Sequence, residues 1–471
     1  MTDKQPPTMD QIIKLCRKAL QENPNNATAH HDLGVALFNQ QDIDGAIEHL
    51  QQATSLAPKS VLSHYVLGVA QGEKGMIDEA VASWKRVLEL DKRNTHKLNG
   101  MAHYFIGKIY GMKGMWDAAA MELNRANKII PNNFLVKNAM AEIHLAKGNF
   151  NQAKQEWSES AELNPEDPRA ATNLCAVALD TGDYALAVET GLQLVKNGHD
   201  DAAVRFNIGI ANLRLGETDA AIHHLEKAAE LDPQDLDIRL NLGEALVKKG
   251  MIEQGVQHWE QAAKDHPKSP HPLYNIGLTY SQNGLLQRAE EYWAQALQRK
   301  PDYLPVFVAR GTRYAELGKW KESLEAWQQA LLIEPDALLV RLNMMLIYLQ
   351  QGQYREVLQL ASDEIKDNPD VQFVSAISQL ALGQSEQALT MLEKLKQEQV
   401  DVFSRYYSLL QQPQIRELLQ NGASDRQAFV EEILQASTEQ PHPASESNQP
   451  APEVAEQHKG FWNSLLKALR K

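Results

Sequence analysis

The chain has 471 residues and a formal net charge of −14 at pH 7. This acidic balance favours solubility and argues against general binding to nucleic acid, whose phosphates would repel it. Only two cysteines occur, Cys16 and Cys175, so a disulfide framework is excluded. The sequence shows neither the apolar core of a secretory signal nor an apolar run of about 18 residues that could span a bilayer, and we expect a cytoplasmic protein.

The first predicted element is a lone helix over residues 9–21, which ends before Pro24. Apolar residues recur within it at intervals of three and four, as on one face of a helix. Residues 9–26 are therefore set apart from the strongly repetitive region that follows.

Residues 27–399 repeat with a period of 34. Apolar residues recur at helical spacing on both sides of a glycine, which ends the first helix of each repeat, and prolines close most repeats. Small residues recur at the points where two antiparallel helices must approach closely. Successive turn glycines are 34 residues apart seven times in a row, flanked by steps of 39 and 31: Gly75, Gly114, Gly148, Gly182, Gly216, Gly250, Gly284, Gly318, Gly352 and Gly383.

This pattern resembles the tetratricopeptide repeat family. The resemblance implies an all-α fold, a right-handed α-solenoid of about eleven helix pairs, with residues 9–26 as an N-terminal capping helix. Ten repeats are expected between residues 27 and 371, and a shortened eleventh ends near residue 399. Five extra residues, around Asn94 to Gly100, lengthen the loop between the second and third repeats.

Residues 400–436 lose the repeat register but keep helical amphipathicity. The segment SDRQAFVEEILQAS begins at Ser424, a suitable N-cap residue. We expect these helices to form a C-terminal cap that covers the last repeat.

Nothing in the repeats indicates catalysis, because no phosphate-binding loop or nucleophile elbow is present. We expect a protein that is not an enzyme and has no cofactor. His30, His64 and His103 share one repeat position, but no carboxylate or cysteine shares it. Packing is a better interpretation of these histidines than a metal site.

Two columns of aromatic residues, together with Cys175, are predicted to form the interlocking core. The tryptophan column lies on the second helix of its repeats: Trp84, Trp157, Trp259, Trp293 and Trp327. The turn-edge column follows the turn glycine: Trp116, Phe150, Tyr184, Trp320 and Tyr354.

One column of the first helix is polar, although asparagine is a poor choice for a helix interior. In the family this position faces the concave groove. The column is similar to one in the superhelix of the O-linked sugar transferases, where asparagines hydrogen-bond the backbone of an extended peptide. An amide suits that task because it offers a donor and an acceptor. The alternative is that the amides bond only to neighbouring helices. The asparagine column reads Asn173, Asn207, Asn241, Asn275, Ala309 and Asn343.

Arg205 and Arg239 lie two residues before two of these asparagines, so the middle of the groove is expected to be basic unless these are simply solvated charges. The asparagines and these two arginines are the predicted partner-binding residues. The lysine and asparagine pair of chaperone-binding family members is not reproduced. Self-association is also expected, since solenoids of this family often self-associate.

The end of the chain has a different composition. Residues 437–457 are rich in proline, serine and glutamate, which predicts a flexible linker. Residues 458–471, HKGFWNSLLKALRK, follow. Their helical wheel places basic residues, Lys467 and Arg470 among them, opposite an apolar face. That face consists of Phe461, Trp462, Leu465, Leu466 and Leu469.

Such a helix is too short to span a bilayer and needs a surface on which to fold. Its basic amphipathic pattern fits an anionic membrane interface, and the alternative is docking on a partner or on its own solenoid. The sequence thus predicts a non-catalytic adaptor that binds partner segments in its groove and lies peripherally on the inner membrane face. The alternative function is a soluble assembly or chaperone-like factor, or a regulatory subunit, whose last helix binds protein.

Overall fold

The computed structural model describes residues 8–363, 365–399, 401–422 and 426–436. The predicted linker at 437–457 and the terminal helix at 458–471 lie outside these residues. Contacts divide the chain into two compact units, Met1–Pro233 and Gln234–Lys471, and each unit is considered by itself. Within the described residues all regular secondary structure is helical.

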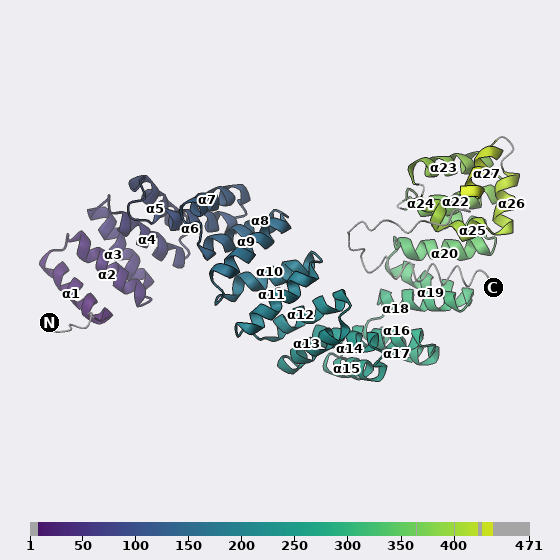
Figure 1. The fold of residues 1–471 in the computed structure, drawn as a ribbon, viewed down its shortest axis with the longest axis horizontal. Coiled ribbons are helices and arrows are strands. Elements are labelled where there is room, and N and C mark those ends of the chain that lie inside the picture. The colour runs from purple at the N-terminus through teal and green to yellow at the C-terminus, as the bar shows by residue number, and fades with distance from the viewer. Residues whose placement is uncertain (1–7, 364, 400, 423–425, 437–471) are drawn as a thin grey trace. The chain divides into compact units, whose positions relative to one another are not determined.

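The first unit begins with α1 (Met9–Glu22), which packs on α2, and continues as six antiparallel helix pairs (Figure 1). The pairs are α2 (Ala27–Asn39) with α3 (Ile43–Leu56), α4 (Val61–Glu73) with α5 (Ile77–Leu90), α6 (Asn99–Met112) with α7 (Trp116–Ile129), α8 (Phe134–Ala146) with α9 (Phe150–Leu163), α10 (Pro168–Asp180) with α11 (Tyr184–Lys196), and α12 (Ala202–Leu215) with α13 (Thr218–Leu231).

The second unit contains five further pairs and a helical end segment, and one continuous apolar core joins its last repeats to that segment. The pairs are α14 (Leu236–Lys248) with α15 (Ile252–Asp265), α16 (His271–Gln282) with α17 (Leu286–Arg299), α18 (Leu304–Glu316) with α19 (Trp320–Ile333), α20 (Leu338–Gln350) with α21 (Tyr354–Leu360), and α22 (Pro369–Ala381) with α23 (Ser385–Glu398). The end segment is α24 (Asp401–Arg405), α25 (Tyr407–Leu410), α26 (Pro413–Asn421) and α27 (Gln427–Ala436).

The paired helices confirm the predicted all-α repeat fold, and two glycine positions show why the pattern recurs. Gly284, in the turn between α16 and α17, has φ of 80°, a conformation that side chains with a Cβ disfavour. Gly277 lies where α16 meets α17, and a Cβ there would come within 2.5 Å of the Trp293 ring. Glycine is therefore required once for backbone conformation and once for close helix packing.

The first helices of neighbouring repeats form the inner face of each unit. In the first unit α2 contacts α4, α6 contacts α8, and α10 contacts α12, whereas successive second helices make few contacts with one another. The same holds for α14 with α16 and α16 with α18 in the second unit. On a first helix, the side chains that point away from the paired second helix therefore line this inner face.

The tryptophan column is buried, as predicted, and Trp293 and Trp327 have no exposed surface. The prediction holds only in part for the turn-edge column. Tyr184, Trp320 and Tyr354 are half-buried and pack against the apolar core. It is wrong for Trp116, which is 40% exposed, and for Phe150, which is 47% exposed. Both residues are the first of their second helix, beside the turn. Cys175 is buried as predicted, and this burial raises the pKa of its thiol to about 11.

Ion pairs cross from repeat to repeat along the turn edge of the first unit. In each pair, a lysine in the turn of one repeat contacts an aspartate at the start of the preceding repeat's second helix. The three pairs are Lys74 with Asp44, Lys113 with Asp78 at 2.5 Å, and Lys147 with Asp117 at 2.6 Å.

The predicted longer loop between the second and third repeats is organised by Asp91. This carboxylate is 5% exposed and accepts hydrogen bonds from the backbone N–H groups of Thr95 and His96, both at 2.8 Å. These backbone donors, with the His96 side chain at 3.0 Å, lower the pKa of Asp91 to about 2. Asn94 and Lys97 adopt positive φ of 52° and 58°, so the loop holds two non-glycine residues in the left-handed region.

Candidate functional site

The predicted asparagine column is carried by first helices in both units. In the first unit, Asn173 lies on α10 and Asn207 on α12, and both are half-buried. In the second unit, Asn241 on α14 and Asn275 on α16 are half-buried, whereas Asn343 on α20 is only 7% exposed. Four of the five amides are thus accessible in part to a ligand on the inner face.

These amides differ in the bonds that they already make. Asn241 Nδ2 donates to the carbonyl oxygen of Asp237 in its own helix at 2.8 Å. The amides of Asn173, Asn207 and Asn275 make no side-chain hydrogen bond to another described residue. These three can therefore exchange bonds with water for bonds with a peptide without breaking a contact within the chain.

Arg205 lies on α12 and Arg239 lies on α14, and each arginine forms an ion pair with an aspartate. Arg205 forms a bidentate pair with Asp200 at 2.6 and 2.7 Å, and its Nη1 lies 3.1 Å from His224 Nδ1. Arg239 lies 3.5 Å from Asp265, and both arginine side chains are about 15% exposed. They pack the first helix on the second, so any basic character that they lend to the inner face is largely neutralised.

The predicted histidine column serves packing in the same way. His30 and His64 each contact a proline carbonyl oxygen, those of Pro24 and Pro58, at 3.0 and 3.1 Å. His103 Nδ1 bonds Glu122 at 2.6 Å, which lowers the pKa of Glu122. Within the described part of the chain, no group of three acidic, histidine or cysteine side chains is arranged to hold a metal ion.

A hollow of about 390 Å³ opens on the inner face of the first unit. It is formed by three successive first helices, α6, α8 and α10, and it includes one residue of the asparagine column. The lining consists of Tyr104, Lys108, Leu135, Asn138, Ala139, Glu142, Pro168, Arg169, Thr172 and Asn173. We call this the α6–α8–α10 hollow.

The hollow combines an apolar floor with charges of both signs. Leu135, Ala139 and Pro168 supply apolar surface. Partial loss of solvent raises the pKa of the Glu142 carboxyl group, although Lys108 and Arg169 act in the opposite direction. Burial likewise raises the pKa of Tyr104.

Asn138 is the residue of this hollow that sequence reasoning missed. It is 8% exposed, and its Oδ1 has no hydrogen-bond partner among the described residues. It lies one residue before the asparagine column, and the equivalent residues of the next two repeats are Thr172 and Phe206. The available signal was an asparagine in the middle of a first helix, but no periodicity pointed to it.

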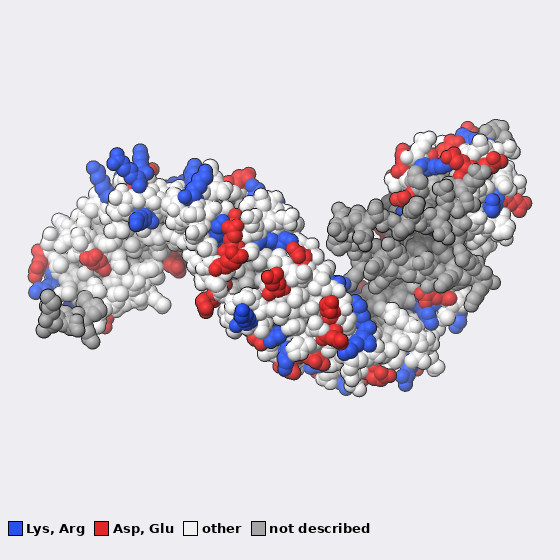
Figure 2. Space-filling model, in the orientation of Figure 1, with Lys and Arg blue, Asp and Glu red and all other residues white. Residues whose placement is uncertain are grey.

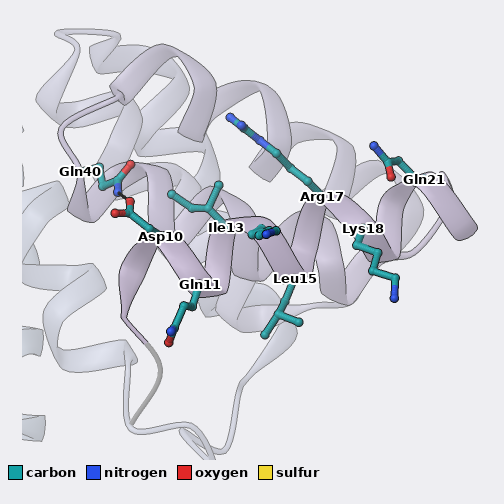
Figure 3. Close-up of a pocket in the computed structure, with 9 residues that line it drawn as sticks. Asp10, Gln11, Ile13, Leu15, Arg17, Lys18, Gln21 and Gln40 are labelled. Atoms are coloured by element: carbon teal, nitrogen blue, oxygen red, sulfur yellow. Dashed lines mark hydrogen bonds between the residues drawn. The ribbon is translucent and has the colours of Figure 1, made fainter. Parts of the chain in front are cut away.

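A larger and shallower hollow of about 960 Å³ lies along α1 (Figure 3). Apart from Gln40, whose Nε2 donates to Asp10 at 2.7 Å, its lining comes from this single helix. Leu15 and Lys18 point away from the repeats in Figure 3, and Leu15 is 63% exposed. This surface is the outer side of α1 rather than an enclosed site.

Charges are distributed unevenly over the first unit. On the face shown in Figure 2, lysine and arginine side chains gather beside α4 and α5, whereas acidic and basic side chains are interspersed over α8 to α13. The described helices include none with the length and apolarity required to cross a bilayer.

Four sequence profiles, each described as a tetratricopeptide repeat, match the chain at residues 9–71 and 212–271, 138–202 and 177–236, 270–303, and 370–399. Together they cover more than half of its length. The chain belongs to the tetratricopeptide repeat family. No curated protein matches the sequence significantly.

Solved structures of other repeat proteins are similar in part. YrrB, described as a protein with an unusual peptide-binding site, is 19% identical, with 40% of this chain and 96% of YrrB covered and a TM-score of 0.35. MamA from Desulfovibrio magneticus RS-1 is 20% identical, with 36% and 96% covered and a TM-score of 0.33. The Cut9–Hcn1 assembly of APC/C is 14% identical, with 92% and 93% covered and a TM-score of 0.34. Scores this low place no binding site on the present chain.

Proposed function

We propose that this tetratricopeptide repeat protein is a non-catalytic adaptor that binds extended segments of partner proteins on the inner faces of its two units. Repeats of this family typically serve protein–protein interaction, and the family scaffold is typically non-catalytic. The observation that carries the proposal is the set of half-buried amides on first helices, three of which lack a side-chain hydrogen bond to a described residue.

An extended peptide offers an N–H donor and a C=O acceptor at each residue, and each asparagine amide can meet one of each. Asn207 and Asn275 are the clearest candidates, and Asn173 and Asn241 extend the set. Arg205 and Arg239 position their helices more than they face a ligand, because Asp200 and Asp265 hold them. Asn343 needs a local rearrangement to reach a partner, since it is buried.

The test is a pull-down of partners with the full chain and with the triple variant Asn207→Ala/Asn241→Ala/Asn275→Ala. We expect partner binding to weaken by about 1 kcal/mol for each lost hydrogen bond, with little change in thermal stability. The double variant Asn124→Ala/Asn151→Ala is the control, because those exposed asparagines lie on the second helices α7 and α9. Undiminished binding, or a collapse in stability, would refute the role of the amides.

We further propose that residues 458–471 bring the adaptor to an anionic membrane surface. If this segment forms a helix, its sequence would place five apolar residues on one face and the basic residues on the other. Each Lys or Arg near an anionic surface contributes about 1 kcal/mol. We propose the same division of the chain that its sequence predicts: a cap at 9–26, repeats at 27–399, a second cap at 400–436, a linker at 437–457 and the membrane-binding helix at 458–471.

Vesicles with and without anionic lipid test this second proposal. The full chain should sediment only with the anionic vesicles, and less at high salt, because screening weakens exposed charges. Trp462→Asp/Leu466→Asp should abolish sedimentation, whereas Asn463→Asp/Ser464→Asp, which adds the same charge on the polar face, should only weaken it. If the full chain does not sediment with anionic vesicles, the membrane proposal is refuted, and binding to protein becomes the alternative role of this segment.

A further inference from the structure

Leu332, near the end of α19, is the most exposed large apolar side chain that the structure describes, with an exposed fraction of 75%. A single exposed leucine is ordinary on a protein surface. This one, however, interrupts a polar column of the repeats. The equivalent residues of the six preceding repeats are Lys128, Glu162, Lys196, Glu230, Lys264 and Gln298.

Leu332 borders a hollow of about 420 Å³ in the second unit, which we call the α19–α21 hollow. Its apolar lining is Leu331 and Leu332 of α19, Met344 and Tyr348 of α20, and Leu360 of α21. Two second helices supply most of the lining, so this hollow is separate from the inner face. An apolar hollow beside a fully exposed leucine indicates a contact surface.

The α19–α21 hollow is open because α21 is short. This helix has seven residues and ends at Leu360, whereas α19 has 14. Arg341 Nη1 donates to the carbonyl oxygen of Leu360 at 3.2 Å, so a side chain caps the end of α21. The last turns of α19 therefore have no continuation of α21 beside them. Leu331 and Leu360 are left as partly exposed edges of the large apolar core of this unit.

The charge of the hollow is complementary to the terminal segment of the same chain. The lining includes the acid Glu356 and neither lysine nor arginine. Glu325 lies one turn before Gln328, another lining residue, on α19. Residues 458–471 contain four basic residues and neither aspartate nor glutamate. As a helix, their sequence would present five apolar side chains on one face.

The terminal segment is also within reach of the hollow. The described chain stops at Ala436 in α27, and Val430 and Ile433 of α27 belong to the same apolar core as Met344. If the 21 residues at 437–457 behave as a coil, they span about 25 Å on average, close to the length of about 21 Å expected for α19. Such a tether gives an effective concentration of about a millimolar, so a weak contact is sufficient for docking.

We propose that residues 458–471 dock in the α19–α21 hollow of their own chain. Their apolar face lies on Leu331, Leu332 and Leu360, and their basic residues lie towards Glu325 and Glu356. Docking and membrane binding use the same apolar face, so each excludes the other. The hollow therefore covers this face when no membrane is present. This contact lies outside the inner faces and goes beyond the adaptor function.

The experiment replaces Trp462 of the full chain with the photo-crosslinking residue benzoylphenylalanine, which keeps an aromatic group at this position. Isotope-labelled and unlabelled chains are mixed, irradiated without lipid and analysed by mass spectrometry, which separates crosslinks within a chain from those between copies. We expect crosslinks within one chain to residues of the α19–α21 hollow. Crosslinks that lie elsewhere, that form only between copies, or that do not form at all overturn the proposal.

Leu332→Lys in this chain should lower the yield of the crosslinks about tenfold, because it removes an apolar contact and adds a charge that repels the basic segment. Folding should not suffer, since three other repeats carry lysine at this position. Leu317→Lys is the matched control. Leu317 is 45% exposed in the same helix pair and does not line the hollow, and lysine is again found at the equivalent position of other repeats, as Lys113, Lys147 and Lys249. Equal crosslinking by the two variants overturns the proposal.

Anionic vesicles separate docking from the membrane proposal. At a lipid concentration that sediments only part of the unaltered chain, Leu332→Lys should sediment more than Leu317→Lys, which adds the same charge but leaves the hollow intact. If no chain sediments but the crosslinks form as expected, docking stands and membrane binding is refuted. If the unaltered chain sediments and no crosslink forms within the chain, membrane binding stands and docking is refuted.

Discussion

The tryptophan column and the turn-edge column are equally regular in sequence but lie in different surroundings. Trp293, in the middle of α17, is fully buried against Gly277 of its own repeat. Trp116, the first residue of α7, leaves 40% of its surface exposed. Trp320, which is likewise the first residue of its helix α19, is half-buried against the apolar core. A regular period therefore does not by itself decide how deeply an aromatic residue is buried.

The largest expected effect separates these two tryptophans. Trp293→Ala should lower the free energy of unfolding by about 3–5 kcal/mol, because it leaves a cavity between the paired helices. Trp116→Ala should cost under about 1 kcal/mol, since much of that side chain already meets solvent. Native-state hydrogen exchange is the suitable measurement, because long repeat arrays do not unfold in one step. Equal losses of unfolding free energy in the two variants would show that Trp116 is as much a part of the core as Trp293.

A smaller effect tests how closely the buried tryptophan is packed. Gly277→Ala places a Cβ about 2.5 Å from Trp293 and should cost about 1 kcal/mol or somewhat more. In the pair α8–α9 an alanine, Ala141, already packs beside Trp157, so we expect the cost of Gly277→Ala to be close to about 1 kcal/mol. In a Trp293→Ala background the same substitution should cost less, and a double-mutant cycle by native-state hydrogen exchange measures the difference. Absence of coupling would show that the ring does not meet the new methyl group.

The smallest effect concerns the loop that precedes α6. The pKa of Asp91 is lowered from 3.8 to about 2, so its stabilising contribution is complete above pH 3.8 and is lost as the pH falls through about 2. Hydrogen exchange at Thr95 and His96 should speed up over this range. Trp84 should stay buried, because it stacks on Phe105 with ring centroids 4.8 Å apart. Asp91→Asn should loosen the loop already at pH 7 and remove the pH dependence, and an unaltered loop would refute this role.

Helix pairs, turn glycines and the tryptophan column were predictable because they depend on contacts within a single repeat. Gly277 and Trp293, for example, are 16 residues apart and meet across one turn. The exposure of Phe150 was not predictable in this way, since Trp320 at the equivalent position is half-buried against the apolar core whereas Phe150 is 47% exposed. A period shows which residues are equivalent, but it does not show how much solvent each one meets.

The candidate site was predictable only in part for a related reason. The column correctly placed Asn173, Asn207, Asn241 and Asn275 on first helices, where they are half-buried. It did not indicate that Asp200 engages Arg205, because such a pairing requires the folded loop before α12. Asn138 escaped notice because its surroundings come from three different helices rather than from its own repeat.

The ion pairs on the turn edge of the first unit have a consequence for its cooperativity. Each of them joins one repeat to the next, so a solvent-exposed contact contributes to the coupling between neighbours and not to the stability of a single repeat. Exposed pairs are individually weak and are screened by salt. Rising ionic strength should therefore shorten the stretch of chain that melts as one unit before it lowers the intrinsic stability of any helix pair.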